Sequence, residues 1–232
     1  LENVINFVLS ENQILKGNFN LTSNFLNINE FIPTSTYETE DENEVKTEVS
    51  GVVEIPTNLN VSIQTNAAKT QYDDVTIENL RGNVLIQNGT LKLSNGTLGI
   101  IGATAKMEAM YKNEGTQKAY FDYKINASEF DIKRAYNEIK MFREIVTAAE
   151  SAEGIVGLNY SIKGVLNNQM EPVMPSLEGS GTLSVKKVKM KGFKLLNVVS
   201  SKTENPDIKD PDISKVDIKT TIKNNIVTIE RF

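Results

Sequence analysis

The sequence of 232 residues contains no cysteine and no histidine. Without cysteine the chain forms no disulfide, holds no Fe–S cluster and offers no thiol nucleophile. Without histidine it lacks the usual general base near neutral pH, every serine–histidine–acid triad, and the zinc sites that depend on imidazole. We therefore expect no catalytic residue, no metal site and no cofactor. A binding or structural protein is favoured over an enzyme, and only a carboxylate-dependent or lysine-dependent enzyme remains as an alternative.

The charge balance and the lack of long apolar runs exclude two further classes. Acidic residues outnumber basic ones by 30 to 25, so the formal net charge is -5 and the basic surface expected of a nucleic-acid-binding protein is missing. No run of about 18 apolar residues occurs, so no segment is predicted to span a bilayer. Because the sequence begins with Leu1 and shows no signal peptide, we expect it to be a piece of a longer protein.

What the sequence does have is a persistent alternation of apolar and polar residues. Leu59, Val61 and Ile63 alternate with polar residues, and the same period of two recurs along most of the chain. This period is typical of strands that bury one face. We predict a mainly β (α+β) protein built on an antiparallel meander, in which strands adjacent in sequence are neighbours in space.

Two Asn-Gly pairs suggest where the meander turns. Asn88-Gly89 and Asn95-Gly96 each lie between alternating stretches, and Asn-Gly is a strong hairpin signal because both turn residues take a positive φ. We therefore predict hairpins at both pairs, a turn at 113–115 and a returning strand through Ala127. A last hairpin is predicted across Asn224-Asn225.

One segment departs from the alternation. From Asp131 to about Glu150 the apolar residues follow a spacing of three and four, which predicts an amphipathic helix over 131–150 with Asp131 as its N-cap. A second, short helix is predicted over 193–199.

An acidic stretch divides the chain. Residues 34–50 are nearly devoid of apolar side chains, so we predict a solvated loop or linker there. It separates an N-terminal β segment, 1–33, interpreted as part of a larger domain, from a β-rich domain over 51–232.

Three local clusters of residues have a functional and a structural interpretation. A lysine stretch either contacts anionic lipid headgroups or protects a strand face from aggregation. Acidic residues near two Asx-Pro pairs, Asn205-Pro206 and Asp210-Pro211, suggest a calcium site. Their spacing does not match an EF-hand loop, and such residues are common in turns. Gly99 and Gly102 lack the residues that follow in a phosphate-binding loop, so we interpret them as bends of the sheet. The lysines are Lys186, Lys187, Lys189, Lys191 and Lys194, and the acidic residues are Asp207, Asp210, Asp212 and Asp217.

The order of several short motifs over residues 51–232 resembles the C-terminal region of the bacterial AsmA family, especially its Bacteroidota versions. None of these motifs is a catalytic signature. They are IPTNLNVSI (55–63), VTIENLRGNV (75–84), NGTLKL (88–93), FDIKRA (130–135), EGSGTL (178–183) and MKGF (190–193).

The resemblance implies a parent protein that is anchored in the inner membrane by an N-terminal helix and exposes the rest of its chain to the periplasm. It also implies kinship with groove-shaped proteins thought to carry phospholipid between the two membranes. The first hypothesis is therefore a curved sheet that forms a groove or half-barrel and binds phospholipid or another lipid by its acyl chains. The second hypothesis is a scaffold in outer-membrane biogenesis that contacts other envelope proteins. The groove candidates are Leu59, Val61, Ile63, Val84, Ile86, Leu91, Leu93, Met107, Phe121, Tyr123 and Ile125.

Overall fold

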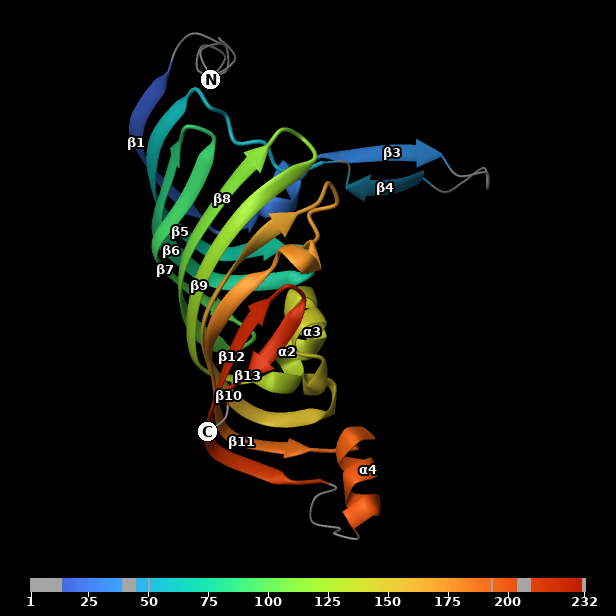
Figure 1. Ribbon diagram of the computed structural model, residues 1–232. Helices are drawn as coiled ribbons and strands as arrows, with labels where there is room; N and C mark the ends of the chain where they lie inside the picture. The colour runs from blue at the N-terminus through green and yellow to red at the C-terminus, as the bar shows by residue number, and fades with distance from the viewer. Residues whose placement is uncertain (1–13, 39–44, 50, 193, 204–209, 231–232) are drawn as a thin grey trace.

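The computed structural model describes residues 14–38, 45–49, 51–192, 194–203 and 210–230. An 11-stranded, strongly curved sheet dominates these residues, and it is not closed into a barrel (Figure 1). In spatial order its strands are β1 (Leu15–Ser23), β5 (Leu59–Tyr72), β6 (Val75–Gln87), β7 (Thr90–Ile100), β8 (Ala103–Glu114), β9 (Lys118–Asp131), β10 (Ala152–Leu166), β11 (Glu178–Met190), β12 (Asp212–Lys223) and β13 (Ile226–Ile229), with β2 (Leu26–Asn27) pairing beside β5.

The predicted mainly β meander is confirmed from β5 to β13, where each strand pairs antiparallel with the next in sequence. The N-terminal strands differ, because β1 and β2 pair with β5 in parallel, which makes the sheet mixed. A parallel partner requires a long connection. The chain supplies it between β2 and β5.

That connection contains the predicted acidic linker. Residues 34–38 and 45–49 form a separate hairpin, β3 (Thr34–Glu38) paired with β4 (Val45–Val49), while 39–44 and 50 lie outside the described residues. Because β1 joins the same sheet as β5, the segment 34–50 does not divide the sheet into two parts.

The turns match one Asn-Gly prediction and contradict the other. Asn88 and Gly89 both have positive φ and join β6 to β7 as predicted. Asn95-Gly96 instead lies inside β7, where the register with β8 shifts between Leu93 and Gly96. This pair is a β-bulge, which bends the strand without ending it. The β7–β8 turn is formed by Ile101 and Gly102, also with positive φ.

The long amphipathic helix is present but interrupted. Asp131 is the N-cap, and its carboxylate accepts hydrogen bonds from the Lys133 and Arg134 amides. The helix breaks at Ile139 and at Val146, whose backbones leave the helical region. The resulting elements are α2 (Ile132–Glu138), α3 (Lys140–Ile145) and the 3-10 turn η2 (Thr147–Ser151). The predicted short helix is α4 (Lys194–Thr203), longer than the predicted 193–199, and Phe193 lies outside the described residues. Two further 3-10 turns are η1 (Ile28–Phe31) and η3 (Met174–Ser176).

The apolar side chains of the strands share one face of the sheet, and α2 and α3 lie against this concave side (Figure 1). Phe130, Val156 and Val185 from neighbouring strands pack with Ile132 and Ala135 of α2 in the larger core cluster. The opposite, outer face is mostly polar, and the packing of α2 and α3 against the concave side buries apolar surface, which stabilises the fold.

Candidate functional site

The inward-facing residues of β5 to β9, which we call the concave face, include no charged side chain. The cross-strand register places them in continuous rows, for example Val61, Ile86, Leu91 and Tyr111. The face comprises Leu59, Val61, Ile63, Thr65, Ala67, Thr70, Tyr72, Val75, Ile77, Leu80, Gly82, Val84, Ile86, Leu91, Leu93, Gly96, Leu98, Ile100, Ala103, Ala105, Met107, Ala109, Tyr111, Asn113, Ala119, Phe121, Tyr123, Ile125, Ala127 and Phe130.

All of the predicted groove residues lie on this face, but they fall into two groups. Val61 is buried, and Phe121 is buried in the smaller core cluster. Met107 and Ile125 pack against the larger cluster and Tyr123 against the smaller one, so these side chains belong to ordinary core. The others are half-buried and belong to neither cluster. We call this second group the apolar strip: Leu59, Ile63, Val84, Ile86, Leu91 and Leu93.

The apolar strip runs across three adjacent strands. Val84 of β6 lies opposite Ile63 of β5 on one side and Leu93 of β7 on the other. Ile86 and Leu91 form the next row. These side chains keep accessible surface although they lie on the concave side of the sheet. The strip is therefore the part of the concave face that could bind an apolar ligand without displacing the helices.

The segment before β5 is tied to the end of β8 and to the turn that follows it. The Val52 amide donates to the Thr116 carbonyl at 3.0 Å, and the Ile55 amide donates to Asn113 Oδ1 at 2.9 Å. The Tyr111 hydroxyl donates to the Val53 carbonyl at 2.8 Å. These bonds hold residues 52–55 at one end of the concave face.

Tyrosines supply the titratable groups of the concave face. Burial raises the pKa of Tyr72, Tyr111 and Tyr123 above the ordinary value, and the pKa of Tyr111 reaches about 12. The charge that Tyr72 would carry raises the pKa of both other tyrosines further. The phenols therefore stay protonated at neutral pH, and the hydroxyl of Tyr111 donates a hydrogen bond to the Val53 carbonyl.

The predicted headgroup lysines lie away from this face. Lys186, Lys187, Lys189 and Lys191 are exposed on or just after β11, and the register directs Lys187 and Lys189 to the outer side, opposite the inward-facing Val188. Two of them are in ion pairs: Lys189 with Asp212 at 3.6 Å and Lys191 with Glu153 at 2.7 Å. The structure does not bring the lysines together with the apolar strip.

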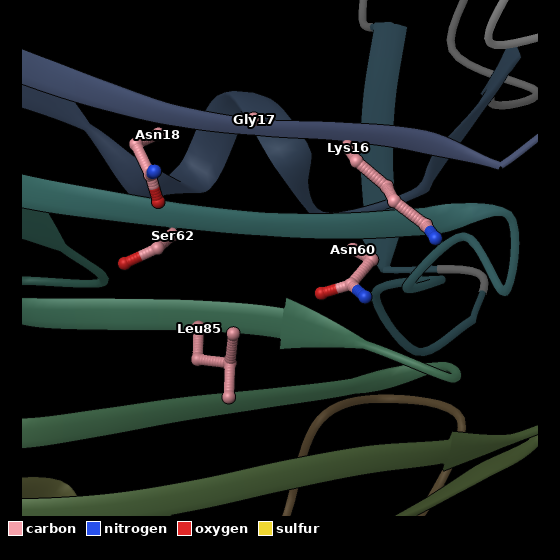
Figure 2. A pocket seen from close by; sticks show the side chains of 6 residues that line it. All are labelled: Lys16, Gly17, Asn18, Asn60, Ser62 and Leu85. Atoms are coloured by element: carbon pink, nitrogen blue, oxygen red, sulfur yellow. The ribbon is translucent and has the colours of Figure 1, made fainter.

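Two shallow hollows lie elsewhere. The first, of about 470 Å³, is formed by β1, β5 and β6 beside the outer face of the sheet, and Figure 2 shows its lining of Lys16, Gly17, Asn18, Asn60, Ser62 and Leu85. The second, of about 390 Å³, lies around the bulges of β6 and β7 and contains one carboxylate, Glu78, beside Arg81. Neither hollow holds the pair of carboxylates that an acid–base hydrolase would need.

The acidic residues near the Asx-Pro pairs make ordinary surface contacts. Asp210 accepts a hydrogen bond from the Gly192 amide at 3.0 Å, Asp212 pairs with Lys189, and Asp207 lies outside the described residues. Within the described part of the chain, no group of three or more acidic side chains is placed to hold a metal ion. No described helix combines the length and apolarity that crossing a membrane requires.

Sequence reasoning named only part of the concave face, and Thr70, Tyr72 and Tyr111 are among the residues that it left out. Tyr111 could have been included, because it continues the alternation that contains Met107. Tyr72 and Thr70 could not, because the inward-facing positions of β5 change from odd to even residue numbers between Ala67 and Thr70, which interrupts the alternation.

Comparison with known proteins identified no relative: no family model, no curated protein and no solved structure matches the chain.

Proposed function

We propose that this chain is a non-catalytic, lipid-binding module of AsmA type, whose concave face shelters acyl chains. The proposal includes a parent protein held at the inner membrane by a segment outside this sequence, with the module in the periplasm and a role in outer-membrane biogenesis. The observation that carries the proposal is the apolar strip, a band of half-buried aliphatic side chains on a face without charge.

The energetics favour a hydrocarbon ligand. Each methylene group moved from water onto such a face gains about 0.8 kcal/mol, so even part of an acyl chain is worth several kcal/mol. A charged ligand would lose hydration there and gain no partner, because no ionised side chain points inward from β5 to β9. The strip therefore suits the uncharged part of a lipid.

Adjacent residues of β6 provide a matched test. Val84 belongs to the apolar strip, whereas Leu85 points to the outer face, 38% exposed. We expect the purified protein to carry phospholipid detectable by native mass spectrometry. Val84→Gln should lower lipid occupancy severalfold, while Leu85→Gln should leave it unchanged.

Thermal unfolding of both variants controls for loss of structure. A protein that is folded yet carries no lipid after purification, and takes none from phospholipid vesicles, would contradict the proposal. Equal occupancy in the two variants would show that lipid binds elsewhere.

The scaffold hypothesis is a second candidate, and the sheet edges favour it. Edge strand β13 exposes Ile226, Val227 and Ile229, and edge strand β1 exposes Phe19 and Leu21. Unprotected edges with apolar side chains can pair with a strand of another chain. The two functions are compatible, since the edges and the apolar strip are separate surfaces.

A further inference from the structure

The last strand of the sheet, β13, has an open outer edge. Within the described residues it pairs with β12 alone, and every side chain from Ile226 to Ile229 is exposed. The register places Val227 opposite the buried Ile222, so Val227 and Ile229 face the concave side while Ile226 and Thr228 face the outer side. A strand with one unpaired edge can pair with a further strand.

The backbone of β13 presents donors and acceptors at this edge. The Glu230 amide, one position after the strand, donates to the Lys219 carbonyl of β12 at 3.0 Å. Hydrogen-bonded and non-hydrogen-bonded positions alternate along an antiparallel pair. Every second residue back from Glu230 therefore also bonds to β12, whereas the N–H and C=O groups of Val227 and Ile229 point to the open edge.

These features make β13 complementary to itself. When two copies of the strand pair antiparallel about Thr228, Val227 of each copy lies opposite Ile229 of the other, and both positions are hydrogen-bonded. The two Thr228 residues face each other between them, at a non-hydrogen-bonded position. Each residue thus meets a residue of its own kind on its own face of the sheet, and the two sheets join with their concave faces on the same side.

The charges near β13 also fit this pairing. The strand itself contains no charged residue. Glu230 falls opposite Ile226 of the second copy, which is paired with Lys223 on that copy's β12. The two strands that carry Glu230 and Lys223 are then roughly 10 Å apart, whereas the two Glu230 residues are separated by about 13 Å along the strands. Unlike charges therefore come closer together than like charges.

We propose that this chain forms a symmetric dimer in which β13 pairs antiparallel with β13 of a second copy. A closed twofold contact is the commonest arrangement of homo-oligomers. The contact involves one short strand and is smaller than the roughly 1,200–2,000 Å² of a stable complex, so the dimer forms only at high protein concentration. The inference goes beyond the proposed function, because the apolar strip lies on other strands and because the strand that pairs here belongs to a second copy of the chain.

The absence of cysteine from the chain allows a direct test. Thr228→Cys introduces one thiol per chain, and the two Cα atoms of a non-hydrogen-bonded pair lie about 4.5 Å apart, within the range of a disulfide. We expect mild oxidation of the concentrated variant to convert most of it to a covalent dimer on a non-reducing gel. Dilution before oxidation should lower the cross-linked fraction.

Ile226→Cys is the matched control, because residue 226 is exposed on the same strand and the same outer face. In the proposed dimer its two thiols are about 13 Å or more apart, which is too far for a disulfide. Oxidation should therefore cross-link this variant far less than Thr228→Cys at the same concentration.

A second variant tests the backbone pairing. Val227→Pro, added to Thr228→Cys, removes an N–H group that points to the open edge and keeps the bonds to β12, and proline is tolerated on such an edge. Loss of this donor from both copies should lower cross-linking about tenfold. The thermal unfolding temperature of the double variant should stay close to that of Thr228→Cys.

The outcomes separate this inference from the proposed function. Equal cross-linking at positions 226 and 228, no cross-linking at 228, or cross-linking that survives Val227→Pro would overturn the dimer and leave lipid binding standing. Phospholipid occupancy of Thr228→Cys, measured by native mass spectrometry, should equal that of the wild type. A protein that cross-links at 228 but takes up no lipid would support the dimer and overturn only the proposed function.

Discussion

Tyr111 couples the concave face to the segment before β5. Its phenol donates to the Val53 carbonyl, and burial and the neighbouring Tyr72 raise its pKa to about 12. An unfolded tyrosine ionises near pH 10. Below that pH both states hold the proton, whereas between about pH 10 and 12 only the folded state does, so stability falls as pH rises through this window.

We therefore expect the free energy of unfolding of the wild type to decline between pH 10 and 12, and Tyr111→Phe to flatten that decline. Urea unfolding at several pH values measures it. Tyr120→Phe is the control, because that ring is exposed on the outer face. Parallel pH profiles for wild type and Tyr111→Phe would show that the buried phenol does not contribute.

At the level of single residues, the sequence predicts which side of the sheet a side chain faces, because residues alternate between the two faces of a strand. The alternation put the groove candidates on one strand face, and the register places all of them on the concave face. It could not tell the half-buried Ile63 from the buried Phe121, because both occupy equivalent positions in an alternating strand. What covers each residue depends on α3 and on the β10–β11 loop, which are distant in sequence.

At the level of elements, strands and helix were predictable but their interruptions were not. Asn88-Gly89 and Asn95-Gly96 are the same dipeptide with the same positive φ at Asn, yet one makes a turn and the other a bulge. The difference arises from pairing partners on β6 and β8 that continue past Asn95. The parallel pairing of β1 with β5 likewise depends on contacts across 44 positions, as between Leu15 and Leu59.

The bulge between β10 and β11 gives the element-level prediction. Gly154 has a φ of 141°, and a Cβ there would collide with the carbonyl oxygen of Lys187 on β11. Because backbone would have to move, Gly154→Ala should destabilise the protein by about 3 kcal/mol. Gly115→Ala, in a turn with open space around it, should cost only about 1 kcal/mol.

Chemical denaturation of the two alanine variants measures the difference. Equal losses of stability would mean that the β10–β11 pairing adjusts to a side chain, and that the bulge is not a fixed feature of the curved sheet.

For the whole molecule, the sequence predicted a mainly β fold with a curved sheet and an amphipathic helix, and the structure confirms this. It did not predict how much of the concave face remains open. The helices cover Met107 and Ile125 but leave Val84 and Leu93 outside both clusters, because α2 and α3 pack over the later strands. The position of the cover along the sheet, a tertiary property, decides which candidates can meet a ligand.

The open sheet has a second consequence at its edge. Ile226 and Ile229 of β13 are 63% and 60% exposed, and no lysine interrupts this edge strand. Natural edges usually carry such charges to prevent association. We therefore predict concentration-dependent association of the chain in sedimentation velocity, and its loss in Ile229→Lys. Asn159→Lys adds the same charge to the outer face of the interior strand β10 and should associate like the wild type.

Because the apolar strip lies on other strands, Ile229→Lys should keep full lipid occupancy, whereas Val84→Gln should associate normally while losing lipid. Parallel loss of both properties in either variant would show that edge and strip act as one surface, and would contradict the separation of binding from assembly proposed for this sheet.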